Sequence, residues 1–102
     1  MKLYYVYLIE CSDKSYYTGH TSNLNQRVYD HNAGKHASAY TYKRRPVTLK
    51  WFEAFTDPSQ AIKVERQLKG WSRRKKLALI EENWEKLVEY SKNYSRYGKI
   101  EE

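Results

Sequence analysis

Apolar and polar positions along the chain follow a strand-like period in three segments. The segment LYYVYLIE at 3–10 is rich in aromatic and β-branched residues, lacks glycine and proline, and is apolar on both faces, which is typical of an inner strand. The polar cluster CSDKS at 11–15 predicts a turn, and YYTG at 16–19 resumes the strand pattern, so together they predict a hairpin. The segment VTLKWFEAF at 47–55 predicts a third strand.

Three other segments carry the spacing and the capping residues of helices. The first, at 23–34, opens on an asparagine and stops at a glycine, and the second, at 57–70, opens on Asp-Pro and stops at a glycine. The third begins with Ser72 as its cap and is interrupted near Asn83. The order ββαβαα predicts an α/β fold in which helices flank a small, mostly antiparallel, three-stranded sheet.

The length of 102 residues allows a single core. We expect a domain at 1–82, followed by a C-terminal helical extension at 83–102 whose last residues are frayed.

Composition adds an uneven distribution of charge. The formal net charge is +7; residues 1–80 hold 15 lysines and arginines against 6 acids, whereas residues 81–102 hold 4 against 6. A basic folded body attracts polyanions such as nucleic acid, although net charge can also serve only to keep a protein soluble.

A single cysteine, Cys11, cannot form an internal disulfide, which fits a reducing compartment. No stretch is apolar enough to span a bilayer, and the N-terminus reaches an acid too early for a secretory signal. We therefore expect a cytoplasmic protein that does not engage membranes.

The hairpin brings two tyrosines together if its turn consists of residues 12–14. Ile9 then lies opposite Tyr17 and Tyr7 lies opposite Gly19, which makes the two tyrosines diagonal neighbours on one face of the sheet. Gly19 would leave an open space beside Tyr7 where a substrate could approach. A two-residue turn would instead shift the register and separate the two hydroxyls.

Each of the first two helices places polar side chains among its apolar positions. Arg27 and His31 fall on the apolar stripe of the first helix, where a charge is costly without a partner; the alternative is an arginine reaching out from the edge and a histidine bonded to a backbone carbonyl. Glu65 falls inside the apolar arc of the second helix, where it needs a metal or a cation, and Lys69 four residues later is the ordinary partner.

These residues lie within motifs that resemble the GIY-YIG nuclease superfamily. The half-motifs correspond to YVY at 5–7 and YTG at 17–19, followed by HTSNLNQRVYDH at 20–31 and by QAIKVERQLKGW at 60–71. The resemblance covers about residues 4–76. Within the superfamily, the sequence is similar to small stand-alone bacterial members, which are related to the nuclease module of excision repair and to structure-specific endonucleases.

The resemblance implies a role for each matching residue. Tyr7 would be the general base or orient the attacking water, and Tyr17 would position the nucleophile or the scissile phosphate. Arg27 would neutralise charge on the phosphate and His31 would assist proton transfer or phosphate binding. Glu65 would hold one divalent cation, Mg²⁺ or Mn²⁺.

The sequence departs from the family pattern at two positions within the motifs. Tyr5 stands where the family name has glycine, and His20 stands where several relatives have lysine, so His20 would be a weaker phosphate donor or an alternative base. His36 lies in the loop where some members place a further histidine. The residues expected to contact nucleic acid are His20, Lys43, Arg44, Arg45, Lys69, Arg73, Arg74 and Lys75.

The function expected from the resemblance is metal-dependent endonuclease activity on DNA, in repair or recombination. A partner protein would supply targeting, because a chain of this length has little room for a separate specificity domain. Two alternatives stay open: a non-catalytic nucleic-acid-binding module, and a protein-interaction adaptor that uses the tyrosine-rich surface. The oligomeric state is left open.

Overall fold

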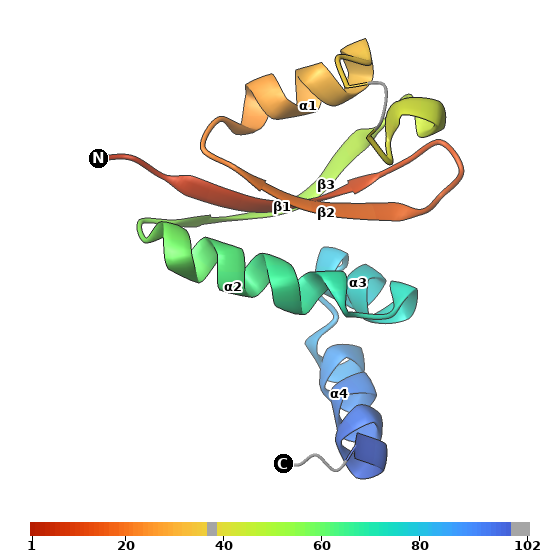
Figure 1. Cartoon of the computed structure of the whole chain (residues 1–102). Coiled ribbons are helices and arrows are strands. Elements are labelled where there is room, and N and C mark those ends of the chain that lie inside the picture. The colour runs from red at the N-terminus through yellow and green to blue at the C-terminus, as the bar shows by residue number, and fades with distance from the viewer. Residues whose placement is uncertain (37–38, 99–102) are drawn as a thin grey trace. The chain divides into compact units, whose positions relative to one another are not determined.

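A three-stranded antiparallel sheet organises the first part of the chain in a computed structural model. The structure describes residues 1–36 and 39–98, with side chains up to residue 91. The strands are β1 (Tyr4–Glu10), β2 (Tyr16–Thr21) and β3 (Thr48–Phe55), and their order is β2-β1-β3. Strand β1 is therefore the inner strand, as predicted, and β2 and β3 form the edges (Figure 1).

The hairpin between β1 and β2 has the three-residue turn and the register considered from the sequence. Tyr7 lies opposite Gly19, and Ile9 lies opposite Tyr17. The turn closes with a hydrogen bond of 2.9 Å from the Lys14 amide to the Cys11 carbonyl, and Lys14 adopts a positive φ of 71°. A residue in this left-handed conformation is what a three-residue hairpin loop requires at its end.

Helices α1 (Leu24–Ala33) and α2 (Pro58–Lys69) cover opposite faces of the sheet (Figure 1). The Asn23 side chain accepts a hydrogen bond from the third residue of α1's first turn, and α1 ends at Gly34, which has a φ of 70°. Asp57 caps α2 in the same way, with a proline in its first turn. Among the helices in the described part of the chain, none has the length and apolar composition needed to cross a membrane.

Alternation along β1 divides the core between the two faces. Tyr7, Ile9 and Cys11 belong to one buried cluster with Leu24 of α1 and Val47. The intervening Val6 and Leu8 are also fully buried, and they point to the face covered by α2, because successive strand residues point to opposite faces. A strand buried on both faces explains why the segment is apolar throughout.

A second compact unit of the chain begins after Gly70. It contains α3 (Arg73–Ile80) and α4 (Trp84–Gly98), so the third helical segment is two helices. Glu82 has a positive φ of 55° between them, and the Asn83 side chain accepts a hydrogen bond of 3.1 Å from an amide in the first turn of α4, which confirms the interruption near Asn83. A domain boundary between residues 82 and 83 stays a prediction, and the expected frayed tail lies mostly outside the described residues.

Two buried threonines give a test of the packing against α2 and at the entry to α1. Among the described residues, Thr18 carries a buried hydroxyl without a hydrogen-bond partner, so Thr18→Val should raise the free energy of unfolding by about 1 kcal/mol. Thr21 is also buried, but its hydroxyl accepts from the Asn23 amide at 3.1 Å.

The matched variant Thr21→Val should therefore lower the free energy of unfolding by about 1 kcal/mol. Chemical denaturation of the two variants checks both signs. Destabilisation by Thr18→Val comparable to that by Thr21→Val would contradict the assignment.

Candidate active site

The side chain of Tyr7 lies across Gly19 of the edge strand. A Cβ atom at Gly19 would overlap the Tyr7 hydroxyl and the adjoining ring carbon. Tyr7 is fully buried. The expectation of an open space beside Gly19 is therefore wrong, since the Tyr7 ring itself fills that space. A side chain that can lean over a glycine buries its own apolar surface there.

The Tyr7 hydroxyl is the first member of a buried hydrogen-bond chain. It lies 3.0 Å from Nε2 of His31, and Nδ1 of His31 lies 2.8 Å from Oγ1 of Thr41. His31 and Thr41 are 9% and 1% exposed. The histidine of α1 is thus satisfied by two side chains and not by a backbone carbonyl, which was the alternative considered from the sequence.

Tyr17 closes this cluster on the solvent side. Its ring centroid lies 6.5 Å from that of Tyr7 and 5.4 Å from that of His31. Tyr40 stacks on Tyr17 with a centroid distance of 6.0 Å and an interplanar angle of 21°. Tyr17 itself is half-buried, so it joins the buried chain to the exposed ring of Tyr40.

Electrostatics at Tyr7 keep its hydroxyl protonated. Burial and then the neighbouring Tyr17 raise the pKa of Tyr7 to about 12, although the guanidinium of Arg27 acts in the opposite direction. Burial, followed by the positive charge of Arg27, lowers the pKa of His31 below its ordinary value. Arg27 is exposed, so it reaches the cluster from the edge of the apolar stripe, as the alternative had it.

Glu65 approaches the same edge strand from the face covered by α2. It is 7% exposed, and its two carboxylate oxygens lie 2.9 Å from Nδ1 of His20 and 3.0 Å from Nζ of Lys69. The ordinary partner four residues on is therefore present. Glu65 also contributes the smallest of the effects that raise the pKa of Tyr7, so the two groups interact electrostatically from opposite faces of β2.

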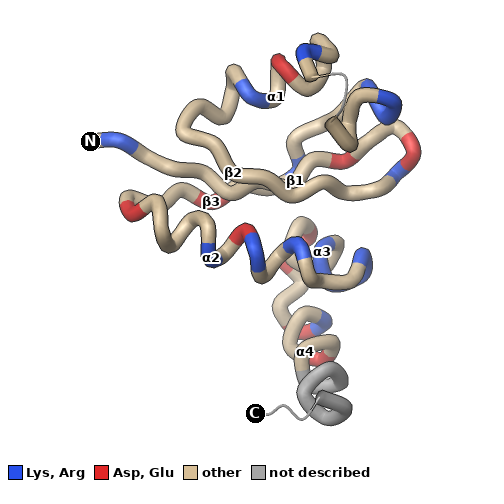
Figure 2. The backbone as a smooth tube through the Cα atoms, viewed as in Figure 1, with Lys and Arg blue, Asp and Glu red and all other residues tan. Residues whose placement is uncertain are grey.

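Figure 2 marks the lysines and arginines along the backbone. Those among them that are expected to contact nucleic acid differ in their exposure. Lys43 and Arg45 are exposed in the first unit, and the Arg45 side chain donates to the Tyr42 carbonyl at 2.8 Å. In the second unit, Arg74 lies over the Tyr90 ring at 4.3 Å and Lys75 over the Trp71 ring at 4.3 Å. Arg73 is exposed there, and burial lowers the pKa of the Lys75 ammonium.

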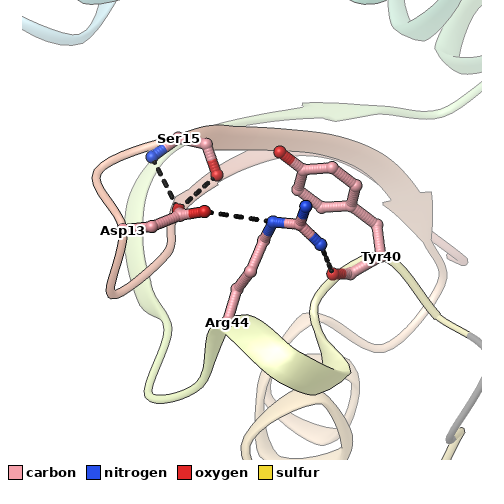
Figure 3. Close-up of polar contacts among 4 residues, drawn as sticks. All are labelled: Asp13, Ser15, Tyr40 and Arg44. Carbon is pink, nitrogen blue, oxygen red and sulfur yellow. Dashed lines mark hydrogen bonds and ion pairs between the residues drawn. The ribbon is translucent and has the colours of Figure 1, made fainter.

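Arg44 has a local structural partner on the hairpin (Figure 3). Its Nε donates to the Asp13 carboxylate at 3.1 Å and its Nη1 donates to the Tyr40 carbonyl at 2.8 Å. The guanidinium also lies 3.9 Å from the centroid of the Tyr40 ring. Arg44 therefore ties the loop before β3 to the hairpin turn and holds Tyr40 against Tyr17.

Three contacts of the site were not foreseen from the sequence. Thr41 and Tyr40 come from a loop without periodicity, so no pattern linked them to His31 or Tyr17. The contact between His20 and Glu65 had a usable signal, because His20 follows Gly19 directly and must point to the opposite face from Tyr7. His36 is exposed, and after burial and Arg27 its positive charge is a further influence that lowers the pKa of His31.

Fold and site together define a small α/β domain with a buried Tyr-His pair at one sheet edge and a buried glutamate at the opposite face. A model of the GIY-YIG catalytic domain matches residues 3–78. A UPF0213 protein of Syntrophus aciditrophicus is 47% identical over 83 residues, which cover 81% of this chain and 95% of that protein. A UPF0213 protein of Staphylococcus haemolyticus is 48% identical over 82 residues, covering 80% and 99%. The chain belongs to the GIY-YIG family, which confirms the resemblance.

Solved structures agree with the fold. The solution structure of the UPF0213 protein of Bacillus halodurans matches with a TM-score of 0.51 and 39% identity, covering 78% of this chain and 83% of that one. A solution structure of a protein from E. faecalis matches with a TM-score of 0.56 and 34% identity, covering 79% and 85%. The predicted α/β class with a three-stranded antiparallel sheet is confirmed.

Alkaline titration tests the enclosure of Tyr7. An unperturbed tyrosine titrates near pH 10, and folding raises the pKa of Tyr7 to about 12. Because folding favours the neutral phenol, the stability linked to this group is present below about pH 10 and is lost as the pH rises from about 10 to 12.

Tyrosinate absorbance should therefore show a late ionisation that is missing in Tyr7→Phe and retained in Tyr29→Phe, where an exposed ring is changed. Identical late titration in Tyr7→Phe and the wild type would contradict the assignment.

Proposed function

We propose that this protein is a metal-dependent endonuclease that hydrolyses phosphodiester bonds of DNA, in repair or recombination. The observation that carries the proposal is the meeting of five groups at strand β2. The hydrogen-bonded pair Tyr7 and His31, with Tyr17 and Arg27, adjoins one face, and the carboxylate of Glu65 lies against the other. Phosphodiester hydrolysis needs an activated water, neutralisation of the phosphate and a Lewis acid, and these groups match that set.

Arg27 and Tyr17 are the members of the site that a phosphate meets first. Arg27 is exposed and carries a guanidinium that suits a phosphate, and Tyr17 is half-buried beside Tyr7. Because the guanidinium of Arg27 acts on the Tyr7 hydroxyl, a phosphate bound by Arg27 would lie close to that hydroxyl. Tyr17 would then hold the nucleophile or the phosphate in line.

Tyr7 and His31 would handle the proton of the attacking water. With a pKa of about 12, Tyr7 is a neutral phenol at physiological pH, so its first role is to orient the water. Its role as a base would need nearby positive charge to favour the phenolate, and Arg27 is the cation of this chain that acts in that direction. His31 is placed to take the hydroxyl proton.

Glu65 fits the single carboxylate to which Mg²⁺ or Mn²⁺ would bind. Its buried carboxylate pairs with Lys69 and lies within hydrogen-bond distance of His20, and a carboxylate in such a position is costly without a partner, which supports a cation site here. Among the described residues, no three His, Cys, Asp or Glu side chains are grouped to hold a metal, so water and substrate oxygens would complete the coordination. The bound ion would supply a Lewis acid for the phosphate and the leaving group.

Exposed basic residues would hold the DNA backbone. Lys43 and Arg45 in the first unit and Arg73 and Arg74 in the second are exposed and cationic. With several phosphates neutralised, binding should weaken steeply with salt. Arg44 is the weaker candidate for this role because Asp13 already pairs with it.

A non-catalytic nucleic-acid-binding module is the second candidate function. The full burial of the Tyr7 hydroxyl and the pairing of Glu65 with Lys69 favour it, since a binding module has no need of an accessible base or a free carboxylate. Cleavage assays separate the two candidates directly.

Glu65→Gln tests the proposal on supercoiled, flapped and branched DNA with Mg²⁺, Mn²⁺ or a chelator. Loss of the carboxylate charge should reduce metal-dependent cleavage by about 100-fold or more while salt-sensitive DNA binding persists, because the basic residues are unchanged. Glu53→Gln makes the same chemical change at an exposed position of β3 and should cleave like the wild type.

Cleavage by Glu65→Gln at the rate of Glu53→Gln would remove the metal role from Glu65. Binding without any cleavage by the wild-type protein would favour the second candidate instead.

A further inference from the structure

Burial determines which atom donates in each hydrogen bond of the chain from Tyr7 to Thr41. Tyr7 is fully buried, so the proton of its hydroxyl needs an acceptor inside the protein. Arg27 offers only N–H donors, and Nε2 of His31 is the acceptor at hydrogen-bond distance. The Tyr7 hydroxyl therefore donates to His31, and Nε2 carries no proton.

The proton of the neutral imidazole must then lie on the other ring nitrogen. Burial and the charge of Arg27 lower the pKa of His31, so the ring is neutral at physiological pH. Its Nδ1–H points to the Thr41 hydroxyl oxygen at 2.8 Å, in a position that is 1% exposed. Without that oxygen the N–H would be buried and unpaired, which is costly.

We infer that Thr41 is a positioning residue that holds His31 in the Nδ1–H tautomer, so that Nε2 is available to the Tyr7 hydroxyl. Thr41 lies outside the motifs and reaches the site from the loop before β3. It acts through His31, because its own side chain is almost completely buried against that ring. This inference rests on the proposed nuclease function for its kinetic consequence, but the tautomer of His31 can be measured without it.

The consequence for hydrolysis concerns one proton. When the attacking water gives a proton to the Tyr7 oxygen, the hydroxyl proton of Tyr7 passes to Nε2, and His31 becomes an imidazolium whose Nδ1–H still donates to Thr41. The opposite tautomer would present an N–H to Tyr7 and could not accept this proton. Thr41 therefore sets whether His31 can serve as the acceptor.

The first experiment measures the His31 tautomer by ¹⁵N NMR of the imidazole ring, in the full chain and without DNA. We expect the Nδ1–H form in the wild-type protein. Thr41→Val removes the hydroxyl with little change of shape and should shift the tautomer ratio by about tenfold or more toward Nε2–H, whereas Thr41→Ser should restore the wild-type ratio. Thr18→Val, which also removes a buried threonine hydroxyl but on the other face of the sheet, should leave the ratio unchanged.

The second experiment compares cleavage kinetics of the same Thr41 variants. Thr41→Val should lower kcat by about 10- to 100-fold with KM within about twofold, and Thr41→Ser should recover most of kcat. A loss of packing alone would predict the opposite order of kcat, because Thr41→Ser removes a methyl group from the core and Thr41→Val does not.

The two experiments distinguish a failure of the positioning role of Thr41 from a failure of the proposed nuclease function. A wild-type His31 in the Nε2–H form overturns the inference even if Thr41→Val fails to fold, and so does a Thr41→Val protein that keeps the wild-type tautomer and kcat. A wild-type protein that cleaves no DNA contradicts the proposed function, while the tautomer measurement still decides the positioning role of Thr41.

Discussion

The hydrogen bond between the Tyr7 hydroxyl and His31 is the interaction on which the site depends. It exists because Gly19 has no side chain, so that the ring of Tyr7 can lean across the edge strand and be covered completely. Burial turns a weak surface contact into a constraint, since a buried hydroxyl without a partner is costly. Helix α1, fixed by caps at both ends, then places His31 where that hydroxyl needs an acceptor.

The two faces of β2 carry different kinds of polar group. The face under α1 holds neutral, hydrogen-bonded groups, and the face under α2 holds a buried charge. Glu65 pairs with a lysine from its own helix and lies within hydrogen-bond distance of a histidine from the strand, so both oxygens of its buried carboxylate have a partner. A metal ion would therefore compete with Lys69 for the carboxylate oxygens of Glu65. Arg44 and Asp13 add a separate constraint by fixing Tyr40 against Tyr17.

Local rules were enough to predict much of this arrangement. The hairpin register follows from the sequence once the turn has three residues, which was one of the two turn lengths considered, and helical periodicity placed His31 and Glu65 on buried faces although both are polar. The open space at Gly19 was wrongly expected because strand register says which residues are opposite, but not how a long side chain leans. Thr41 could not be predicted because it enters the site from a loop, and a contact between residues ten positions apart leaves no period in the sequence.

The central claim is that the Tyr7 phenol is enclosed over Gly19 and donates its proton to Nε2 of His31. The exchange of the Tyr7 hydroxyl proton with water, followed by NMR, tests it most directly. The account predicts a slowly exchanging hydroxyl proton with a coupling to Nε2 of His31 across the hydrogen bond. A hydroxyl proton of Tyr7 that exchanges as fast as that of an exposed tyrosine would contradict it.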